Sequence, residues 1–176
     1  IQGKYATWSG TMLDRTKPII VVAEPGREEE AILRLGRIGF DDVKGFLKGG
    51  LDSLNSRPDL IRRIERVTAV ALSELSQSPE PPSIVDVRSE KEWNAGHIPG
   101  SLNIPLNHLR EKIADLPTDR LTVVHCEGGY RSAIAVSVFA QMGYTHVMDL
   151  VGGFKAWAAS QLPIEKGSAT ATTTAS

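Results

Sequence analysis

The sequence predicts an α/β fold in which helices cover a mostly parallel central sheet. Three short β-branched runs, each bounded by polar residues, are typical of buried parallel strands: residues 19–22, 84–87 and 121–124. Amphipathic helices are predicted after the first and the third run, over residues 28–38 and 132–141. Alternation of strands and helices along one chain is the pattern of α/β proteins.

Glycines and prolines mark where these elements end. Gly39 and Gly143 follow the two predicted helices, at the position where a helix C-terminus favours glycine. Residues 77–82 are rich in proline and cannot continue a helix. Residues 55–59 form a second break, in which Pro58 is placed to begin a helix. A run of charged residues is predicted to form the solvated face of that helix: Arg62, Arg63, Glu65 and Arg66.

The composition excludes several classes of protein. The 176 residues include 20 Lys+Arg and 21 Asp+Glu, so the net charge of −1 lacks the basic excess of a nucleic-acid-binding protein. No run approaches the roughly 18 apolar residues of a membrane helix, and no secretory signal is visible. The chain has one cysteine, Cys126, so an internal disulfide is excluded. We therefore expect a cytoplasmic protein without membrane or nucleic-acid partners.

The chain repeats itself at an offset of 103 to 104 residues. Residues 1–54 align with residues 104–157, and the matches fall mainly at turns and helix ends. The matched pairs are Arg27 and Arg131, Ala31 and Ala135, Gly39-Phe40 and Gly143-Tyr144, and Gly49-Gly50 and Gly152-Gly153. Residues 64–103 form a front half that the first copy lacks.

This repeat predicts the domain organisation. We expect an incomplete, back-half repeat over residues 1–56 and a linker with the start of a helix over residues 57–63. One complete domain is predicted over residues 64–162. Residues 163–176 are predicted to form a disordered tail, because most of them are Gly, Ser, Ala and Thr with little to bury.

The strongest chemical signal lies between the third predicted strand and the helix that follows it. Its residues are His125-Cys126-Glu127-Gly128-Gly129-Tyr130-Arg131-Ser132. Two glycines let the backbone curl so that its N–H groups point inward, and the helix adds the positive end of its dipole. Arg131 adds a permanent positive charge. We therefore expect Cys126 to be partly thiolate and nucleophilic rather than an inert buried residue.

Three ordered motifs between residues 64 and 161 are similar to those of one family. The cysteine segment resembles the active-site loop of rhodanese sulfurtransferases, Cys-x-x-Gly-x-Arg-Ser/Thr. Three segments in the front half of the domain resemble another signature of this family: Ile84-Val85-Asp86-Val87-Arg88-Ser89, Glu92-Trp93 and Gly96-His97-Ile98-Pro99-Gly100-Ser101. A last segment resembles the closing motif of the family: Gly152-Gly153-Phe154-Lys155-Ala156-Trp157. The resemblance implies a rhodanese-like α/β fold with a central parallel sheet flanked by helices.

The resemblance also implies an activity. Cys126 would alternate between thiolate and persulfide as it takes sulfane sulfur from thiosulfate or glutathione persulfide. A thiol or a cyanide-like acceptor would then remove the sulfur. The implied anion cradle consists of Glu127, Gly128, Gly129, Tyr130, Arg131 and Ser132. Arg131 is expected to hold the loop or to assist the donor anion, and Tyr130 and Glu127 bear on substrate choice.

Three further residues are expected to support the site without reacting. Asp86 and Arg88, at a strand end, are predicted to form an ion pair that fixes the loops. His97 is predicted to be a turn or packing residue. No ligand spacing joins the histidines to one another or to Cys126, so neither a metal nor another cofactor is expected in this chain.

Two alternatives stay open at this point. Cysteine-dependent phosphatases and arsenate reductases also carry a Cys-to-Arg anion loop, usually with one residue more than the four between Cys126 and Arg131. The chain could instead be a non-catalytic regulatory module. A non-catalytic role is expected for the first repeat, because it has Val22 or Ala23 at the position of the thiol.

The opening residues, 1–8, resemble the linker of larger proteins. In those proteins a metallo-β-lactamase-fold domain, a persulfide dioxygenase or a thioesterase-like hydrolase, precedes two rhodanese modules. A metal is expected only in such a preceding domain. The incomplete repeat is expected to pack on the complete domain or on another chain, which would allow self-association.

Overall fold

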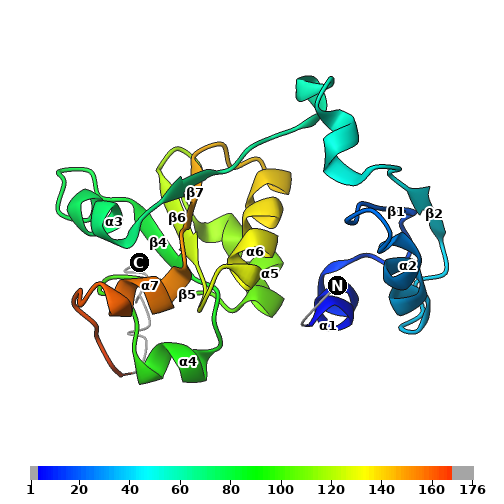
Figure 1. The fold of residues 1–176 in the computed structure, drawn as a ribbon. Coiled ribbons are helices and arrows are strands. Elements are labelled where there is room, and N and C mark those ends of the chain that lie inside the picture. The colour runs from blue at the N-terminus through cyan, green and yellow to red at the C-terminus, as the bar shows by residue number, and fades with distance from the viewer. Residues whose placement is uncertain (1–3, 168–176) are drawn as a thin grey trace. The chain divides into compact units, whose positions relative to one another are not determined.

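The computed structural model describes residues 4–167 of a chain that divides into two compact units, Ile1–Arg63 and Ile64–Ser176 (Figure 1). Over its described residues, 4–63, the first unit has two α-helices and two strands, followed by two short 3-10 helices. In chain order they are α1 (Tyr5–Met12), β1 (Ile19–Val21), α2 (Glu28–Gly36), β2 (Val43–Phe46), η1 (Gly50–Leu54) and η2 (Pro58–Leu60).

The first unit is built on a two-stranded parallel sheet, β1 and β2. Helix α2 joins the strands, and acidic residues in its first turn complement the positive end of the helix dipole. Its small core contains Val21, Ala31, Leu35 and Phe40. After β2 the chain turns at Gly50, whose φ of +59° disfavours other residues. A Cβ on Gly50 would also lie 2.6 Å from the carbonyl oxygen of Ala23, so this position requires glycine.

The second unit is built on a five-stranded sheet in which every pairing is parallel (Figure 1). Its strands are β3 (Glu65–Val67), β4 (Ser83–Asp86), β5 (Leu102–Asn103), β6 (Thr122–His125) and β7 (Val147–Leu150). Their order across the sheet is β3-β7-β6-β4-β5. The prediction of an α/β fold with a parallel central sheet is confirmed.

Helices flank this sheet on both faces. They are α3 (Ala69–Leu75), α4 (Glu90–Ala95), α5 (Leu109–Lys112), α6 (Tyr130–Gln141) and α7 (Gly153–Ala159), with 3-10 turns η3 (Leu106–His108) and η4 (Ile113–Asp115) beside α5. Figure 1 shows α5 and α6 beside one face and α3 and α7 beside the other. The core on the α3 and α7 face contains Val67, Ala69, Leu72, Ile84, Ile98, Val123, Leu150 and Trp157.

Helix α2 ends at Gly36, two residues before its predicted end, and two further differences concern α6 and the charged run. Helix α6 begins at Tyr130, two residues before the predicted start, because Gly129 adopts a φ of +105° and turns the chain directly into the helix. The charged run is not a helical face: Glu65 and Arg66 belong to strand β3. Pairing with β7 places Arg66 beside Asp149, 3.3 Å from Nε to Oδ2, and this contact is not visible in the local sequence.

The first residues of the predicted tail are held against the domain. The carbonyl oxygen of Pro163 accepts a hydrogen bond of 2.8 Å from the Trp157 indole. Glu165 forms an isolated antiparallel bridge with His97. The rest of the predicted tail, residues 168–176, lies outside the described residues. Between residues 4 and 167, no helix has both the length and the apolar character needed to cross a bilayer.

The α6 face of the sheet should depend strongly on Phe139, which is fully buried and packs edge-on against Tyr144 at 5.1 Å between ring centroids. We expect Phe139→Ala to lower the free energy of unfolding by about 3–5 kcal/mol, because it leaves a cavity that the packed core cannot close. Urea unfolding followed by circular dichroism measures this change. Val70→Ala, on the exposed side of α3, is the control and should change it by about 0.5 kcal/mol or less. Equal losses in the two variants would contradict the assignment of the core.

Candidate active site

The site lies at the carboxyl ends of two neighbouring parallel strands. Strand β4 ends at Asp86 and strand β6 ends at His125, and these two residues are partners in the ladder. The chain segments that follow both strands therefore leave the sheet at the same edge, where open α/β sheets place their ligands. Cys126 follows β6 directly and is 1% exposed.

Two groups of the first turn of α6 lie against the sulfur of Cys126. The backbone N–H of Gly129 donates to Sγ over 3.2 Å. The hydroxyl of Ser132 lies 3.7 Å from Sγ and is itself oriented by a 3.1 Å hydrogen bond to the carbonyl oxygen of Gly129. The sulfur thus lies at the N-terminal end of a 12-residue helix, where the helix dipole favours negative charge.

The remaining loop residues divide between solvent and helix. Glu127, Gly128 and Tyr130 are exposed, whereas Ser132 is buried. Three of the residues predicted to form the anion cradle, residues 130–132, belong to the first turn of α6. Among the amides of this segment, that of Gly129 contacts the sulfur.

Arg131 forms a bidentate ion pair with Glu92 on helix α4. Its Nη1 and Nη2 lie 2.7 and 2.6 Å from the two carboxylate oxygens. The same carboxylate accepts hydrogen bonds from the backbone N–H and the hydroxyl of Ser89, which completes a capping box at the start of α4. The hydrogen bond from Arg131, with smaller contributions from Ser89, lowers the pKa of Glu92 to about 2.

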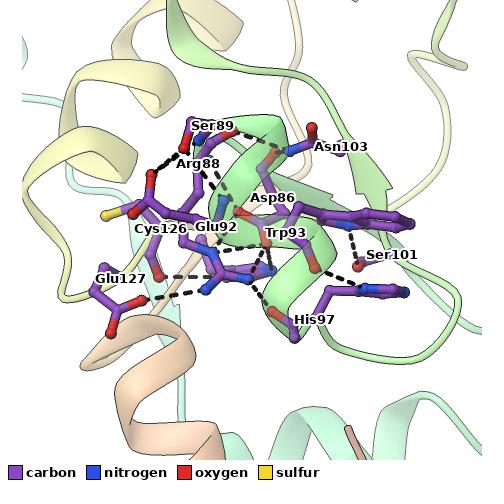
Figure 2. A network of polar contacts seen from close by, with 12 residues as sticks. Asp86, Arg88, Ser89, Glu92, Trp93, His97, Ser101, Asn103, Cys126 and Glu127 are labelled. Atoms are coloured by element: carbon purple, nitrogen blue, oxygen red, sulfur yellow. Dashed lines mark hydrogen bonds and ion pairs between the residues drawn. The ribbon is translucent and has the colours of Figure 1, made fainter. Parts of the chain in front are cut away.

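Arg88 is the other arginine of the site, and it is only 2% exposed. Its guanidinium is paired with the buried carboxylate of Asp86, at 2.7 Å from Nη2 to Oδ2, and it also donates to the carbonyl oxygen of Gly96 (Figure 2). Its Nη1 lies 3.2 Å from the carboxylate of Glu127. The Phe154 ring lies against it, with 4.0 Å between Cζ and the ring centroid.

Two ion pairs of opposite polarity therefore connect the segment after β4 to the segment after β6. In one, an arginine of the first segment, Arg88, holds the acidic Glu127. In the other, an acidic residue of the first segment, Glu92, holds the basic Arg131. The two contacts fix both ends of the turn that carries Cys126. The sequence had indicated Arg88 and Arg131 but not Glu92 as a partner, although the Ser89-x-x-Glu92 capping pattern was a signal for its position.

Two histidines near the site have packing roles in this structure. His97 stacks on Trp93 with 3.4 Å between ring centroids, and its Nδ1 lies 3.0 Å from the Trp93 carbonyl oxygen. His125 is fully buried, and burial lowers its pKa below the ordinary value despite the neighbouring Asp86 carboxylate, 3.7 Å away. His125 is therefore uncharged at neutral pH.

Helix α7 fixes the backbone of the cysteine segment from the other side. The N–H of Phe154 donates to the carbonyl oxygen of Cys126 over 2.8 Å, and that of Lys155 donates to the carbonyl oxygen of Glu127 over 3.0 Å. A Cβ on Gly153 would overlap the Cys126 carbonyl oxygen and lie 2.8 Å from that of Glu127. These bonds hold both carbonyl groups against the start of α7. The sequence motif had marked Gly153 without indicating this close approach.

The low pKa of Glu92 predicts a pH dependence of stability. Its pKa is 4.5 in the reference state and about 2 in the fold, so its stabilising contribution is complete above pH 4.5 and is lost as the pH falls toward 2. Urea midpoints measured between pH 6 and pH 2.5 should fall less in Glu92→Gln than in the natural chain. Glu90→Gln, an exposed carboxylate of the same helix, is the control and should keep the natural pH dependence. Identical curves for the natural chain and Glu92→Gln would contradict this assignment.

Comparison with known proteins agrees with this geometry. The rhodanese-like domain family matches residues 68–160. A sulfurtransferase from Allochromatium vinosum is 34% identical over 101 residues, which cover 57% of this chain and 94% of that protein. Thiosulfate sulfurtransferase PspE from Escherichia coli is 37% identical over 73 residues, which cover 40% of this chain and 69% of that protein. The chain spans 49% and 59% of the length of two other curated relatives.

Solved structures also include proteins that are similar to this chain. A rhodanese-related protein from Thermoplasma volcanium has a TM-score of 0.53 and 34% identity, and the match covers 57% of this chain and 97% of that one. A Rhodopseudomonas palustris protein of unknown function, described as a possible tyrosine phosphatase, has a TM-score of 0.52 and 32% identity, over 65% of this chain and 90% of that one. Because the family match spans 93 of the 176 residues and includes Cys126, the chain belongs to the rhodanese-like domain family.

Proposed function

We propose that this chain is a sulfurtransferase that carries sulfane sulfur as a persulfide on Cys126. The observation that carries the proposal is the environment of the thiol: Cys126 lies at a strand end, with the Gly129 N–H on its sulfur and helix α6 beginning beside it. Such an environment stabilises negative charge on sulfur both before and after it accepts a second sulfur atom. Sulfurtransferases among the relatives support the same reaction class.

The first step is attack of the Cys126 thiolate on the sulfane sulfur of the donor. With thiosulfate, a new S–S bond forms on Cys126, the S–S bond of the donor breaks, and sulfite leaves with the electron pair of that bond. With glutathione persulfide, the same attack on the outer sulfur releases the glutathione thiolate. The name of PspE supports thiosulfate as one donor.

The second step returns Cys126 to its starting state. An acceptor thiolate or cyanide attacks the outer sulfur of the Cys126 persulfide, forms a bond to it, and releases the Cys126 thiolate. The Gly129 N–H and the helix dipole again face the sulfur on which negative charge develops. Neither step needs an external oxidant or reductant.

The contacts of Arg131 disfavour a phosphatase mechanism. A phosphatase would need this guanidinium on the oxyanion of its substrate, but both terminal nitrogens of Arg131 are bound to the two oxygens of Glu92. The ring between Cys126 and Arg131 also holds only four residues. Sulfur transfer requires no tetrahedral oxyanion inside this ring, and so it fits the observed contacts better.

We further propose that the first unit is an incomplete copy of the second, with Ala23 at the position of Cys126. In both units a Gly-Gly pair with positive φ follows a strand: Gly49 and Gly50 at +82° and +59°, and Gly152 and Gly153 at +72° and +61°. The second glycine of the first pair approaches the carbonyl oxygen of Ala23, as that of the second pair approaches the carbonyl oxygen of Cys126. Without a thiol at Ala23, this unit cannot carry sulfur by the proposed route.

Cys126→Ser tests the proposed nucleophile. The variant should lose sulfur transfer from thiosulfate to cyanide, and from glutathione persulfide to a thiol, to the rate without enzyme, because a hydroxyl is neither ionised nor nucleophilic enough at neutral pH. Steady-state formation of thiocyanate or of the product persulfide measures this loss. Activity that survives the substitution would contradict the proposal. A matched hydrolysis assay with an aryl phosphate should give no turnover in the natural chain.

Gly153→Ala tests whether helix α7 positions the cysteine segment. The added methyl group displaces the carbonyl groups of Cys126 and Glu127, so we expect kcat/KM for sulfur transfer to fall about tenfold or more. Gly50→Ala is the matched control, because it introduces the equivalent overlap with Ala23 in the unit without a thiol. That variant should keep its kcat/KM and lose stability only in the first unit. Equal kinetic losses in the two variants would show that the close approach at Gly153 has no specific effect on the site.

A further inference from the structure

Two arginines of the cysteine site are already paired with carboxylates. Arg131 is bound by Glu92 through both of its terminal nitrogens. Arg88 is buried between Asp86 and Glu127. The guanidinium groups therefore fix the loop and are not free to bind an anionic substrate.

The side chains joined by these ion pairs carry a net negative charge. The five ionised side chains that they join are Asp86, Arg88, Glu92, Glu127 and Arg131, with a net charge of −1 before the thiolate is counted. His125 adds no positive charge, because burial lowers its pKa below the ordinary value. Lys155 is an exposed cation next to this group, since its backbone N–H donates to the carbonyl oxygen of Glu127.

Glu127 is the most exposed of the three carboxylates of this group. It follows Cys126 directly in the chain, and its side chain is 51% exposed, whereas the Asp86 carboxylate is fully buried. One of its oxygens, Oε2, is held by Arg88 at 3.2 Å (Figure 2). The Arg88 contact therefore fixes a partly solvated negative charge on the residue that directly follows Cys126.

The charge of the donor decides how strongly this carboxylate acts. Attack of the thiolate on thiosulfate brings together three negative charges, one from the thiolate and two from the donor. When the thiolate attacks a neutral organic persulfide, only its own negative charge is present. When it attacks a persulfide anion, two negative charges come together. Repulsion by a fixed carboxylate grows with the charge of the donor that approaches it.

We propose that Glu127 selects the sulfur donor by charge, so that the site prefers organic persulfides to the dianion thiosulfate. The inference rests on the proposed sulfur transfer through Cys126 and adds the class of donor to it. Cys126–S⁻ attacks the outer sulfur of R–S–SH and forms a new S–S bond to it. The S–S bond of the donor breaks, and the products are Cys126–S–SH and RS⁻. Atoms and charge balance without a further reactant.

Glu127→Gln tests this role with little change in shape, because the amide oxygen still accepts the hydrogen bond from Arg88. We expect its kcat/KM to rise about fivefold for thiosulfate and to fall for cysteamine persulfide, a small donor that carries an ammonium group. Lys155→Gln should lower the ratio of kcat/KM for thiosulfate to kcat/KM for cysteamine persulfide. Glu111→Gln, which removes an exposed carboxylate from helix α5, is the control and should leave the ratio unchanged.

Ionic strength separates a charge effect from a change in loop structure. In the natural chain, kcat/KM for thiosulfate should rise with added salt as the repulsion is screened. The increase of kcat/KM with salt concentration should be smaller in Glu127→Gln. A donor ratio unchanged by Glu127→Gln, with both donors turned over, would overturn the inference and leave the sulfurtransferase proposal intact. No turnover of either donor by the natural chain would overturn the proposed function itself.

Discussion

The buried guanidinium of Arg88 is the contact on which the arrangement of the site depends. It joins strand β4 through Asp86, the end of helix α4 through Gly96, and the cysteine segment through Glu127. The ring of Phe154 on α7 lies against it as well. A buried charge is tolerated only where its partners are complete, and removing one partner of such a pair typically destabilises a protein by about 3–5 kcal/mol. The positions of four segments are therefore coupled through one side chain.

Because of this coupling, different groups position the loop and stabilise charge on the thiol. The arginines and carboxylates set the shape of the turn, whereas the backbone N–H of Gly129 and the dipole of α6 face the sulfur itself. Fixed dipoles need no reorganisation when charge develops on sulfur. In the proposed reaction, these dipoles stabilise the sulfur anion without a free cationic side chain, and the exposed Glu127 influences which donor approaches.

Much of this architecture is predictable from local sequence, and the rest depends on contacts between distant residues. The predicted strands at 84–87 and 121–124 are found within one residue as β4 and β6, because both are buried and β-branched. Strands β3 and β5 are too short and too polar to be recognised alone and form only by pairing with their neighbours. The cysteine segment was predicted from its glycines and strand-to-helix position. The Asp86–Arg88 pair, two residues apart, was predicted from the sequence. The contacts of Arg131 with Glu92 and of Arg88 with Glu127 join residues 39 apart in the chain, so these contacts require the fold.

The central claim is that sulfur resides on Cys126 during the reaction, and intact mass spectrometry tests it most directly. After brief exposure of the chain to a sulfane donor and removal of the excess, the account predicts a mass gain of one sulfur atom. Fragmentation should place that gain on Cys126, and a thiol acceptor or cyanide should remove it. A chain that turns over the donor without ever gaining sulfur on Cys126 would contradict the account.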